Sequence, residues 1–381
     1  MKLTKKELLS LTGIFFAWRA GLFLVALLAS IILPASRPLF PYKNTLLEPS
    51  GLPSWIWGFG NFDGVHYLRI AMLGYGGSDF SQAFFPIFPL LIKLFLFLGN
   101  PVVVGLIIAN IAVFLSTFAI YKLFRTDFDK QISFLSTILF LLFPTAYYLG
   151  SIYSESTFLL FVIVSLYFLK TKKTFTAALF AALAAATRPV GIFLSFVFLY
   201  EFIRYISQNR KDLNGIFKKA LSLVISSTGL ISYMVYLKLN FGSPFYFLVS
   251  TVSFHTGREN SIVLLPQVFF RYAKILISFP INSLPFFNAS LEFLLTLIPL
   301  VLLFLFFKKM NKGYFIFTIC ALLLPTLTGT LSSMPRFALV SFAILPYIVK
   351  ASGRYKILLI VVSAFLEIAL TALFTRGYWI A

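Results

Sequence analysis

Acidic residues are scarce in this chain of 381 residues, which has 12 Asp and Glu against 32 Lys and Arg. It has only two histidines and one cysteine, Cys320. A single cysteine excludes an intrachain disulfide and a cysteine metal site, and the long separation of His66 and His255 excludes an H-E-x-x-H zinc motif. The G-x-x-x-x-G-K-[ST] phosphate-binding loop is also absent. An acid close to a histidine is therefore a rare combination here and a candidate for chemistry.

Apolar residues are abundant instead, at 60% of the chain, while charged residues make up only 12%. Apolar runs of about 20 residues recur along the sequence, which is the length that a helix needs to cross a bilayer. The composition predicts an all-α polytopic membrane protein with a single membrane-embedded domain over residues 1–381. The eleven expected crossings are roughly 9–33, 101–123, 131–149, 156–170, 174–188, 189–204, 219–239, 287–307, 313–331, 336–350 and 356–374.

The net charge of +20 is distributed in a way that indicates membrane topology rather than nucleic-acid binding. Basic residues form short clusters between apolar runs instead of one continuous face. Segment 84–98 is short and has Pro86 and Pro89 near its start, so we expect it to lie in the interface without crossing. The N-terminus is then cytoplasmic, the first span is uncleaved and loop 34–100 faces outward. Because Lys and Arg concentrate in cytoplasmic loops, this topology accounts for the clusters Lys2/Lys5/Lys6, Lys122/Arg125/Lys130, Lys170/Lys172/Lys173, Arg204/Arg210/Lys211/Lys218/Lys219, Lys308/Lys309/Lys312 and Lys350/Arg354/Lys356.

The outer loop contains the segment Phe62-Asp63-Gly64-Val65-His66-Tyr67-Leu68-Arg69. Its apolar spacing predicts a short helix over 64–75 that lies in the interface, with Asp63 at the start, where the helix dipole favours a carboxylate. His66 and Tyr67 follow Asp63 at i+3 and i+4 and share its face. We predict that Asp63 is a general base and that His66 orients a phosphate or hydroxyl. The structural alternatives are a helix cap for Asp63, which Asn61 could also supply, and interfacial anchors for His66 and Arg69.

Other polar residues fall on the same predicted outer face. Glu155 stands at a helix start, where an acid beside an apolar span is a functional candidate or serves the helix dipole. Arg188 and Arg336 are candidates for binding a phosphate bidentately, or else interfacial anchors. The remaining candidates, for an acceptor or a metal, are Asp79, Gln82, His255 and Arg258, with Glu259 beside them; turn and solvated-loop roles are the alternatives.

Several motifs together resemble one family. The Asp63 segment, Gly74-Tyr75 and Ala83-Phe84-Phe85-Pro86-Ile87-Phe88-Pro89 resemble the PIG-V-type mannosyltransferases, the GPI mannosyltransferase II family. The same resemblance extends over Phe143-Pro144-Thr145-Ala146, Tyr153-Ser154-Glu155-Ser156 and Thr187-Arg188-Pro189-Val190-Gly191. One departure is Phe62, where the family often has Trp before the Asp.

The resemblance implies a GT-C membrane glycosyltransferase, in this case a prokaryotic homologue, that uses a lipid-phosphate sugar donor at the outer face of the cell membrane. By resemblance Asp63 is the catalytic base, Glu155 the Tyr-x-Glu acid and Arg188 the arginine of the Arg-Pro pair. Arg188, Arg336 and Arg69 are then expected at the donor phosphate, and a divalent cation is left open as a cofactor. The expected partners are a polyprenyl-phosphate-linked sugar, a lipid or glycan acceptor and membrane lipids.

Two other functions stay open at this point. A transporter or flippase of lipid-linked sugars is the main alternative, although transporters place their polar residues near the bilayer midplane. A non-catalytic subunit of an envelope assembly machine is the other, and it would tolerate the loss of Asp63.

Overall fold

The computed structural model describes residues 3–36, 40–76, 80–254, 257–259 and 261–380. Within these residues the regular elements are helices, apart from one isolated parallel bridge between Val263 and Thr328. The chain forms two compact units. The first consists of residues 1–76, 84–173 and 345–380, and the second of residues 77–83 and 174–344, with residue 381. The all-helical class is confirmed, while the single domain over 1–381 stays a prediction.

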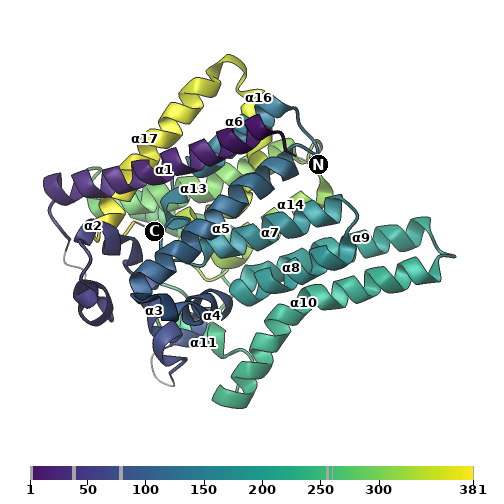
Figure 1. Ribbon diagram of the computed structural model, residues 1–381, viewed down its shortest axis with the longest axis horizontal. Helices are drawn as coiled ribbons and strands as arrows, with labels where there is room; N and C mark the ends of the chain where they lie inside the picture. The colour runs from purple at the N-terminus through teal and green to yellow at the C-terminus, as the bar shows by residue number, and fades with distance from the viewer. Residues whose placement is uncertain (1–2, 37–39, 77–79, 255–256, 260, 381) are drawn as a thin grey trace. The chain divides into compact units, whose positions relative to one another are not determined.

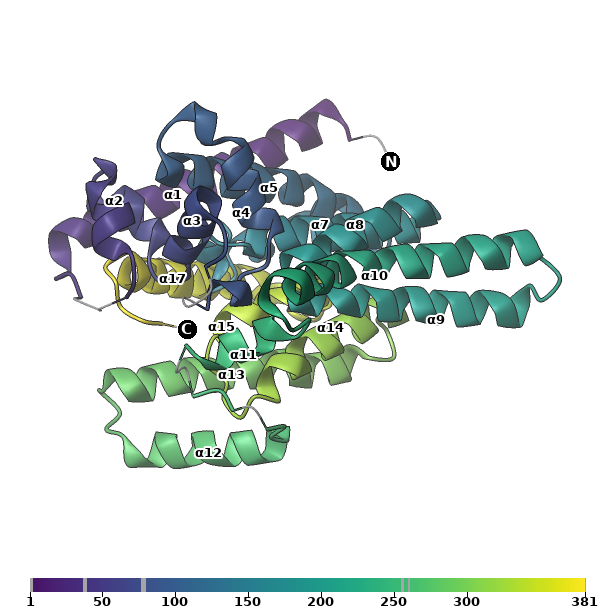
Figure 2. The ribbon, with the colours of Figure 1, turned by 90° about the horizontal axis from the view of Figure 1, so that it is seen from below.

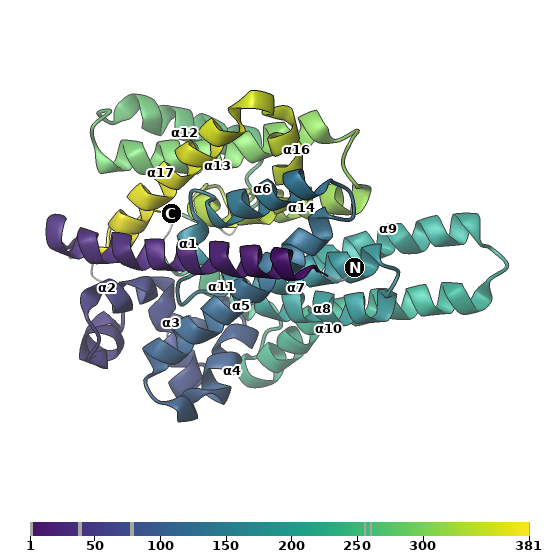
Figure 3. The same cartoon turned by 45° about the horizontal axis from the view of Figure 1, so that its top comes forward.

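The first unit is built around long helices of the N-terminal half and the last helix of the chain. Helix α1 packs along α17 and also contacts α5, and α5 packs on α7 (Figures 1 and 3). A capping box between Thr4 and Glu7 fixes the start of α1. The α-helices are α1 (Lys5–Ile32), α2 (Ser54–Trp57), α3 (Asp63–Leu73), α4 (Ile87–Leu94), α5 (Pro101–Phe124), α6 (Lys130–Leu141), α7 (Glu155–Lys170), α16 (Leu345–Ala351) and α17 (Lys356–Thr375). Short helices are η1 (Lys43–Leu47), η2 (Glu48–Ser50), η3 (Gly58–Gly60), η5 (Leu96–Leu98), η6 (Ala146–Tyr148) and η9 (Gly353–Tyr355).

The second unit contains the middle of the chain. Helices α8 and α9 both pack against α10, and α12 runs beside α13 (Figure 2). The α-helices are α8 (Thr174–Thr187), α9 (Phe193–Gln208), α10 (Leu213–Phe241), α11 (Tyr246–Val252), α12 (Leu265–Ser278), α13 (Leu284–Phe306), α14 (Lys312–Thr326) and α15 (Met334–Phe337). Short helices are η4 (Ser81–Ala83), η7 (Pro189–Ile192) and η8 (Ala338–Ile344).

Seven helical stretches of the described residues are long and apolar enough to cross a membrane. They are Lys5–Ile32, Pro101–Phe124, Pro189–Gln208, Leu213–Phe241, Leu284–Phe306, Met334–Ala351 and Gly353–Thr375. Large apolar side chains on them point outward; Ile31 is 74% exposed and Leu239 is 80% exposed. Exposed apolar surface on this scale fits lipid rather than water. The protein is thus a multi-pass membrane protein, with seven candidate spans in place of the eleven expected.

Several expected crossings are shorter or less regular than the apolar pattern predicted. The helix expected over 131–149 ends at Leu141, because Pro144 lacks a backbone donor and the chain turns into η6. The one expected over 313–331 ends at Thr326, next to Pro325. The one expected over 336–350 is divided among α15, η8 and α16. Segment 84–98 contains only the eight-residue α4 and the turn η5, as a non-crossing segment requires.

Small residues allow α8 and α10 to approach closely. Ala178, Ala181 and Ala185 of α8 are fully buried, and Gly229 of α10 faces the same helix. A Cβ at Gly229 would lie 1.8 Å from the carbonyl oxygen of Ala182. This packing is typical of membrane helices, where small residues let backbones meet.

Replacing Gly229 with alanine is therefore expected to lower the thermal unfolding midpoint of the detergent-solubilised protein. The neighbouring atom belongs to the backbone of α8, so the helices must separate, at a cost of about 1–3 kcal/mol or more. Gly21→Ala is the matched control, because a Cβ at Gly21 meets nothing within 4 Å. Equal midpoints for Gly229→Ala and the wild type would contradict the observed packing.

Candidate functional site

The start of α3 holds Asp63 through a strained turn. Phe62, the residue before it, has φ 60° and ψ −113°, a region that non-glycine residues rarely adopt. The Phe62 ring is fixed by aromatic contacts with Phe40 and Trp379, at centroid distances of 5.1 and 4.9 Å. Strained backbone of this kind persists only where the surroundings hold it, and it clusters at functional sites. Asp63 is half-buried and is the first residue of α3.

Asn61 does not act as a side-chain cap of α3, because its Oδ1 accepts no hydrogen bond. The Asn61 amide instead donates to the carbonyl oxygens of Phe374 and Thr375 at the end of α17, at 2.9 and 3.3 Å. Asp63 occupies the first helical turn, where its carboxylate complements the helix dipole. The predicted helix is confirmed and Asn61 does not cap it, while the roles of Asp63 as a cap or as a base both stay predictions.

Tyr153 joins this turn to the segment that carries Glu155. Its hydroxyl donates to the backbone oxygen of Asn61 at 2.8 Å and accepts from the backbone N–H of Asp63 at 3.3 Å. One residue on, the Ser154 hydroxyl is hydrogen-bonded to Tyr67 at 2.8 Å. Two turns of helix α3 are thereby tied to the start of α7.

Glu155 follows directly as the first residue of α7 and is only 3% exposed. The two acids singled out by the sequence, Asp63 and Glu155, thus open two helices whose starts are joined by Tyr153 and Ser154.

His66 lies inside the first unit rather than in an open interface. It is 6% exposed, its ring stacks on Phe84 at 4.7 Å and the edge of Tyr42 lies 5.7 Å away. Most of α3 is buried in the same way, and only Met72 and Leu73 at its end are exposed. The expected surface helix therefore lies largely within the protein, because both of its flanks are covered.

Arg69 closes the far end of α3. Its guanidinium donates to the carbonyl oxygen of Gly74 at 2.9 Å and lies 5.6 Å from the ring of Tyr42. The side chain holds the turn that leaves the helix. Its predicted role at a phosphate stays a prediction.

Arg188 and Arg336 come together in the second unit. Their guanidinium carbons lie 4.9 and 5.2 Å from the centroid of one ring, that of Phe337. Arg336 is 9% exposed and follows Ser333, which has a positive φ of 69°. Two cations held beside one aromatic ring form a site suited to an anion with several oxygens.

The remaining sequence candidates are separate from these two groups. Gln82 is fully buried, and the Tyr233 hydroxyl donates to its backbone oxygen at 2.7 Å. This hydrogen bond joins η4 to α10 within the second unit. Arg258 is half-exposed. Asp79 and His255 lie outside the described residues.

A further polar cluster in the second unit is centred on Tyr272 and Glu292, which were not candidates from the sequence, and it includes the candidate Glu259. Tyr272 donates to the buried carboxylate of Glu292 and accepts from the backbone N–H of Leu331 at 3.0 Å. Beside it, Arg271 contacts Glu259 and donates to the oxygen of Gly329 at 3.2 Å. Hydrogen bonds from Arg271 and Ser261 hold the pKa of the Glu259 carboxyl below its usual range. This cluster anchors the backbone just before the segment that carries Arg336.

No group of three or more His, Cys, Asp or Glu side chains suited to a metal ion occurs among the described residues.

Residues 14–241 match the mannosyltransferase (PIG-V) family, which is more than half of the chain. The chain belongs to this family. Asp63, Glu155 and Arg188 lie within the matched range, and Arg336 lies beyond it.

Curated relatives of this family match over a shorter stretch. The proteins called GPI mannosyltransferase 2 from two strains of Cryptococcus neoformans var. neoformans serotype D, JEC21 and B-3501A, are each 30% identical over 178 residues. The match covers 43% of this chain and 40% of each relative, so the chain matches less than half the length of these proteins.

Solved structures give more distant matches. The match to a crystal structure of the Archaeoglobus fulgidus oligosaccharyltransferase complex with Zn and sulfate covers 94% of this chain and 53% of the oligosaccharyltransferase chain, with 14% identity and a TM-score of 0.44. The archaeal oligosaccharyltransferase AglB from the same organism, in complex with an inhibitory peptide and a dolichol-phosphate, covers 95% and 56%, with 14% identity and a TM-score of 0.44.

Two of the elements that build the site were missed by the sequence prediction. The Tyr153 hydroxyl joins two backbone groups about 90 residues away. The one available sequence signal for this role was its position two residues before Glu155. The Tyr272–Glu292 pair had one available signal, an acid inside an apolar helix.

Proposed function

We propose that the protein is a membrane glycosyltransferase that moves a mannose-like sugar from a polyprenyl-phosphate donor to a lipid or glycan acceptor at the outer face of the cell membrane. Membership of the PIG-V family supports a mannosyl transfer. The observation that carries the proposal is the joined pair of helix starts that holds Asp63 and Glu155.

Asp63 acts as the general base in this proposal. Its carboxylate takes the proton of the acceptor hydroxyl as that oxygen attacks the anomeric carbon of the sugar. The bond from the anomeric carbon to the phosphate oxygen breaks, and its electron pair leaves with the phosphate. Attack opposite the leaving group inverts the anomeric configuration. The Tyr153 hydroxyl and the turn at Phe62 hold the backbone of the base in place.

Arg188 and Arg336 stabilise the leaving phosphate. The negative charge on the phosphate grows as the sugar departs, so fixed guanidinium groups favour the transition state over the bound donor. Their guanidinium carbons lie 4.9 and 5.2 Å from the centroid of the Phe337 ring, which brings both charges to the same aromatic side chain. A polyprenyl-phosphate is a good leaving group, so the mechanism needs no separate acid at the phosphate.

The donor class is tested with purified protein in vesicles, supplied in parallel with radiolabelled polyprenyl-phosphate-mannose and with a nucleotide-linked mannose. Label is expected to move to extractable acceptor from the lipid-linked donor only, and NMR of the product is expected to show the inverted anomer. Transfer from the nucleotide donor alone, or retention of configuration, would contradict the proposal.

Replacing Tyr153 with phenylalanine is expected to lower the turnover number by about 10- to 100-fold, because a small displacement of a catalytic group is costly. The variant removes the hydroxyl that joins Asn61 to Asp63. Initial rates at saturating donor provide the measurement. Tyr355→Phe, at an exposed tyrosine, is the matched control and is expected to keep the wild-type rate. Unchanged turnover in Tyr153→Phe would show that this hydroxyl does not position the base.

A further inference from the structure

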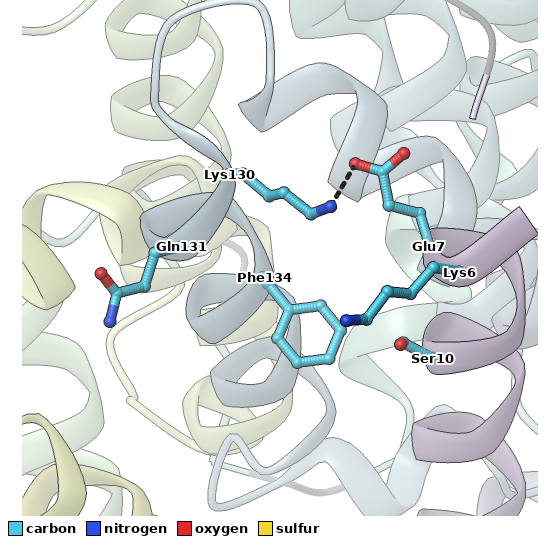
Figure 4. A pocket seen from close by; sticks show the side chains of 6 residues that line it. All are labelled: Lys6, Glu7, Ser10, Lys130, Gln131 and Phe134. Carbon is cyan, nitrogen blue, oxygen red and sulfur yellow. Dashed lines mark ion pairs between the residues drawn. The ribbon is translucent and has the colours of Figure 1, made fainter. Parts of the chain in front are cut away.

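The first turns of α1 and α6 line an open cavity of about 360 Å³, away from the residues considered above. Its size falls within the usual range of small-molecule sites. It lies where the candidate span Lys5–Ile32 begins, which places it at a membrane surface. Figure 4 shows the side chains that line it, which are Lys6, Glu7, Ser10, Lys130, Gln131 and Phe134.

The cavity carries an excess of positive charge. Glu7 is its single acid, and the carboxylate is already engaged by the Thr4 backbone and hydroxyl at 2.9 and 3.0 Å and by the Tyr121 hydroxyl at 2.8 Å. Lys130 also pairs with it, at 3.5 Å. Lys6 extends toward the ring of Phe134 (Figure 4), and within the described part of the chain no carboxylate pairs with it.

An open strip of small residues continues from the cavity along α1. Gly13, Ala17 and Gly21 follow Ser10 at helical spacing, so they lie on the same side of the helix. A Cβ at Gly13 or Gly21 would meet nothing within 4 Å. The exposed ring of Phe16 borders this strip. The strip runs from the charged cavity toward the middle of the span and forms an apolar surface on which an acyl chain could lie.

We propose that this cavity binds the phosphate headgroup of an anionic phospholipid, with one acyl chain lying along the Gly13–Gly21 strip. The headgroup phosphate would contact the Lys6 ammonium and the Ser10 hydroxyl, while Lys130 stays with Glu7. The net positive charge favours an anionic over a zwitterionic headgroup. The apolar strip favours a lipid over a soluble phosphate. The site is independent of the sugar-transfer proposal, because it uses none of the same residues.

The test is an equilibrium titration of the purified full-length protein in detergent with fluorescent phosphatidylglycerol. Lys6→Gln is expected to weaken binding about fivefold, since one basic residue at a lipid surface contributes about 1 kcal/mol. Lys5→Gln removes the same charge one residue away, outside the cavity lining, and is expected to bind as the wild type does. Equal weakening by both variants would overturn the site in favour of general surface attraction.

A second variant tests the acyl-chain track. Gly13→Leu fills the strip without meeting other atoms at Cβ, so the variant is expected to fold and to weaken phosphatidylglycerol binding. Unlabelled phosphatidylglycerol is expected to compete, whereas phosphatidylcholine and glycerol phosphate are not. Competition by glycerol phosphate as strong as by the lipid would assign the cavity to a soluble phosphate and overturn the proposal, as would wild-type binding by Gly13→Leu.

Discussion

Replacing Asp63 with asparagine is expected to reduce sugar transfer by about 10²- to 10⁴-fold, the usual contribution of a general base. Asparagine keeps the size of the side chain but has no site for the acceptor proton. The backbone hydrogen bond from Asp63 to Tyr153 involves the main chain, so the turn is expected to survive the change. The measurement is the initial rate of label transfer from polyprenyl-phosphate-mannose, with donor binding measured separately and expected to stay close to wild type.

Asp127→Asn provides the control for this prediction. Asp127 lies in the same unit and pairs with Lys170 at 2.6 Å, so its variant also loses one negative charge. That variant is expected to transfer sugar at the wild-type rate. A folded Asp63→Asn protein that keeps wild-type turnover would remove Asp63 from the role of base and leave the chemistry to another group.

Replacing Arg336 with glutamine is expected to lower the turnover number by about 10²- to 10³-fold, the typical cost of losing one charge-stabilising donor. The reason is that the guanidinium interacts most strongly with the phosphate as it leaves. Arg188→Gln is expected to have a similar effect. Because both side chains lie beside Phe337, the double variant is expected to lose less than the product of the two single losses.

Arg336→Lys separates charge from shape. Lysine keeps the positive charge but lacks the planar fork of donors that matches a phosphate, so an intermediate rate is expected. Arg204→Gln is the matched control, since Arg204 is an exposed arginine of the same unit. Rates for Arg336→Gln and Arg188→Gln equal to the control, with intact folding, would contradict a role at the donor phosphate.

The local sequence was sufficient to predict the elements that depend on nearby residues. The helix after Phe62 begins at Asp63 as expected, because an acid followed by periodic apolar residues is a local signal. The shortness of the helix after Pro86 was also predicted from the length of its apolar segment, and α4 spans only Ile87–Leu94.

Features that depend on distant residues could not be predicted in this way. Phenylalanine rarely adopts a positive φ, so nothing in the local sequence predicts this conformation at Phe62. The ring contacts that hold it come from Phe40 and from Trp379, which is far away along the chain. Asn61 is a residue type that often caps helices, but its side-chain amide instead donates a hydrogen bond to the carbonyl oxygen of Phe374 at the end of α17. An apolar run such as 131–149 has the same hydropathy whether it continues as a helix or ends at Leu141.

The most direct measurement of the central claim is label transfer by the wild-type protein in sealed vesicles loaded on one side with polyprenyl-phosphate-mannose. The account predicts a new glycosidic product, formed from the acceptor lipids of the vesicle, with release of polyprenyl phosphate in equal amount. Movement of intact polyprenyl-phosphate-mannose across the bilayer without any new glycosidic bond would contradict it, and would identify a flippase instead of a transferase.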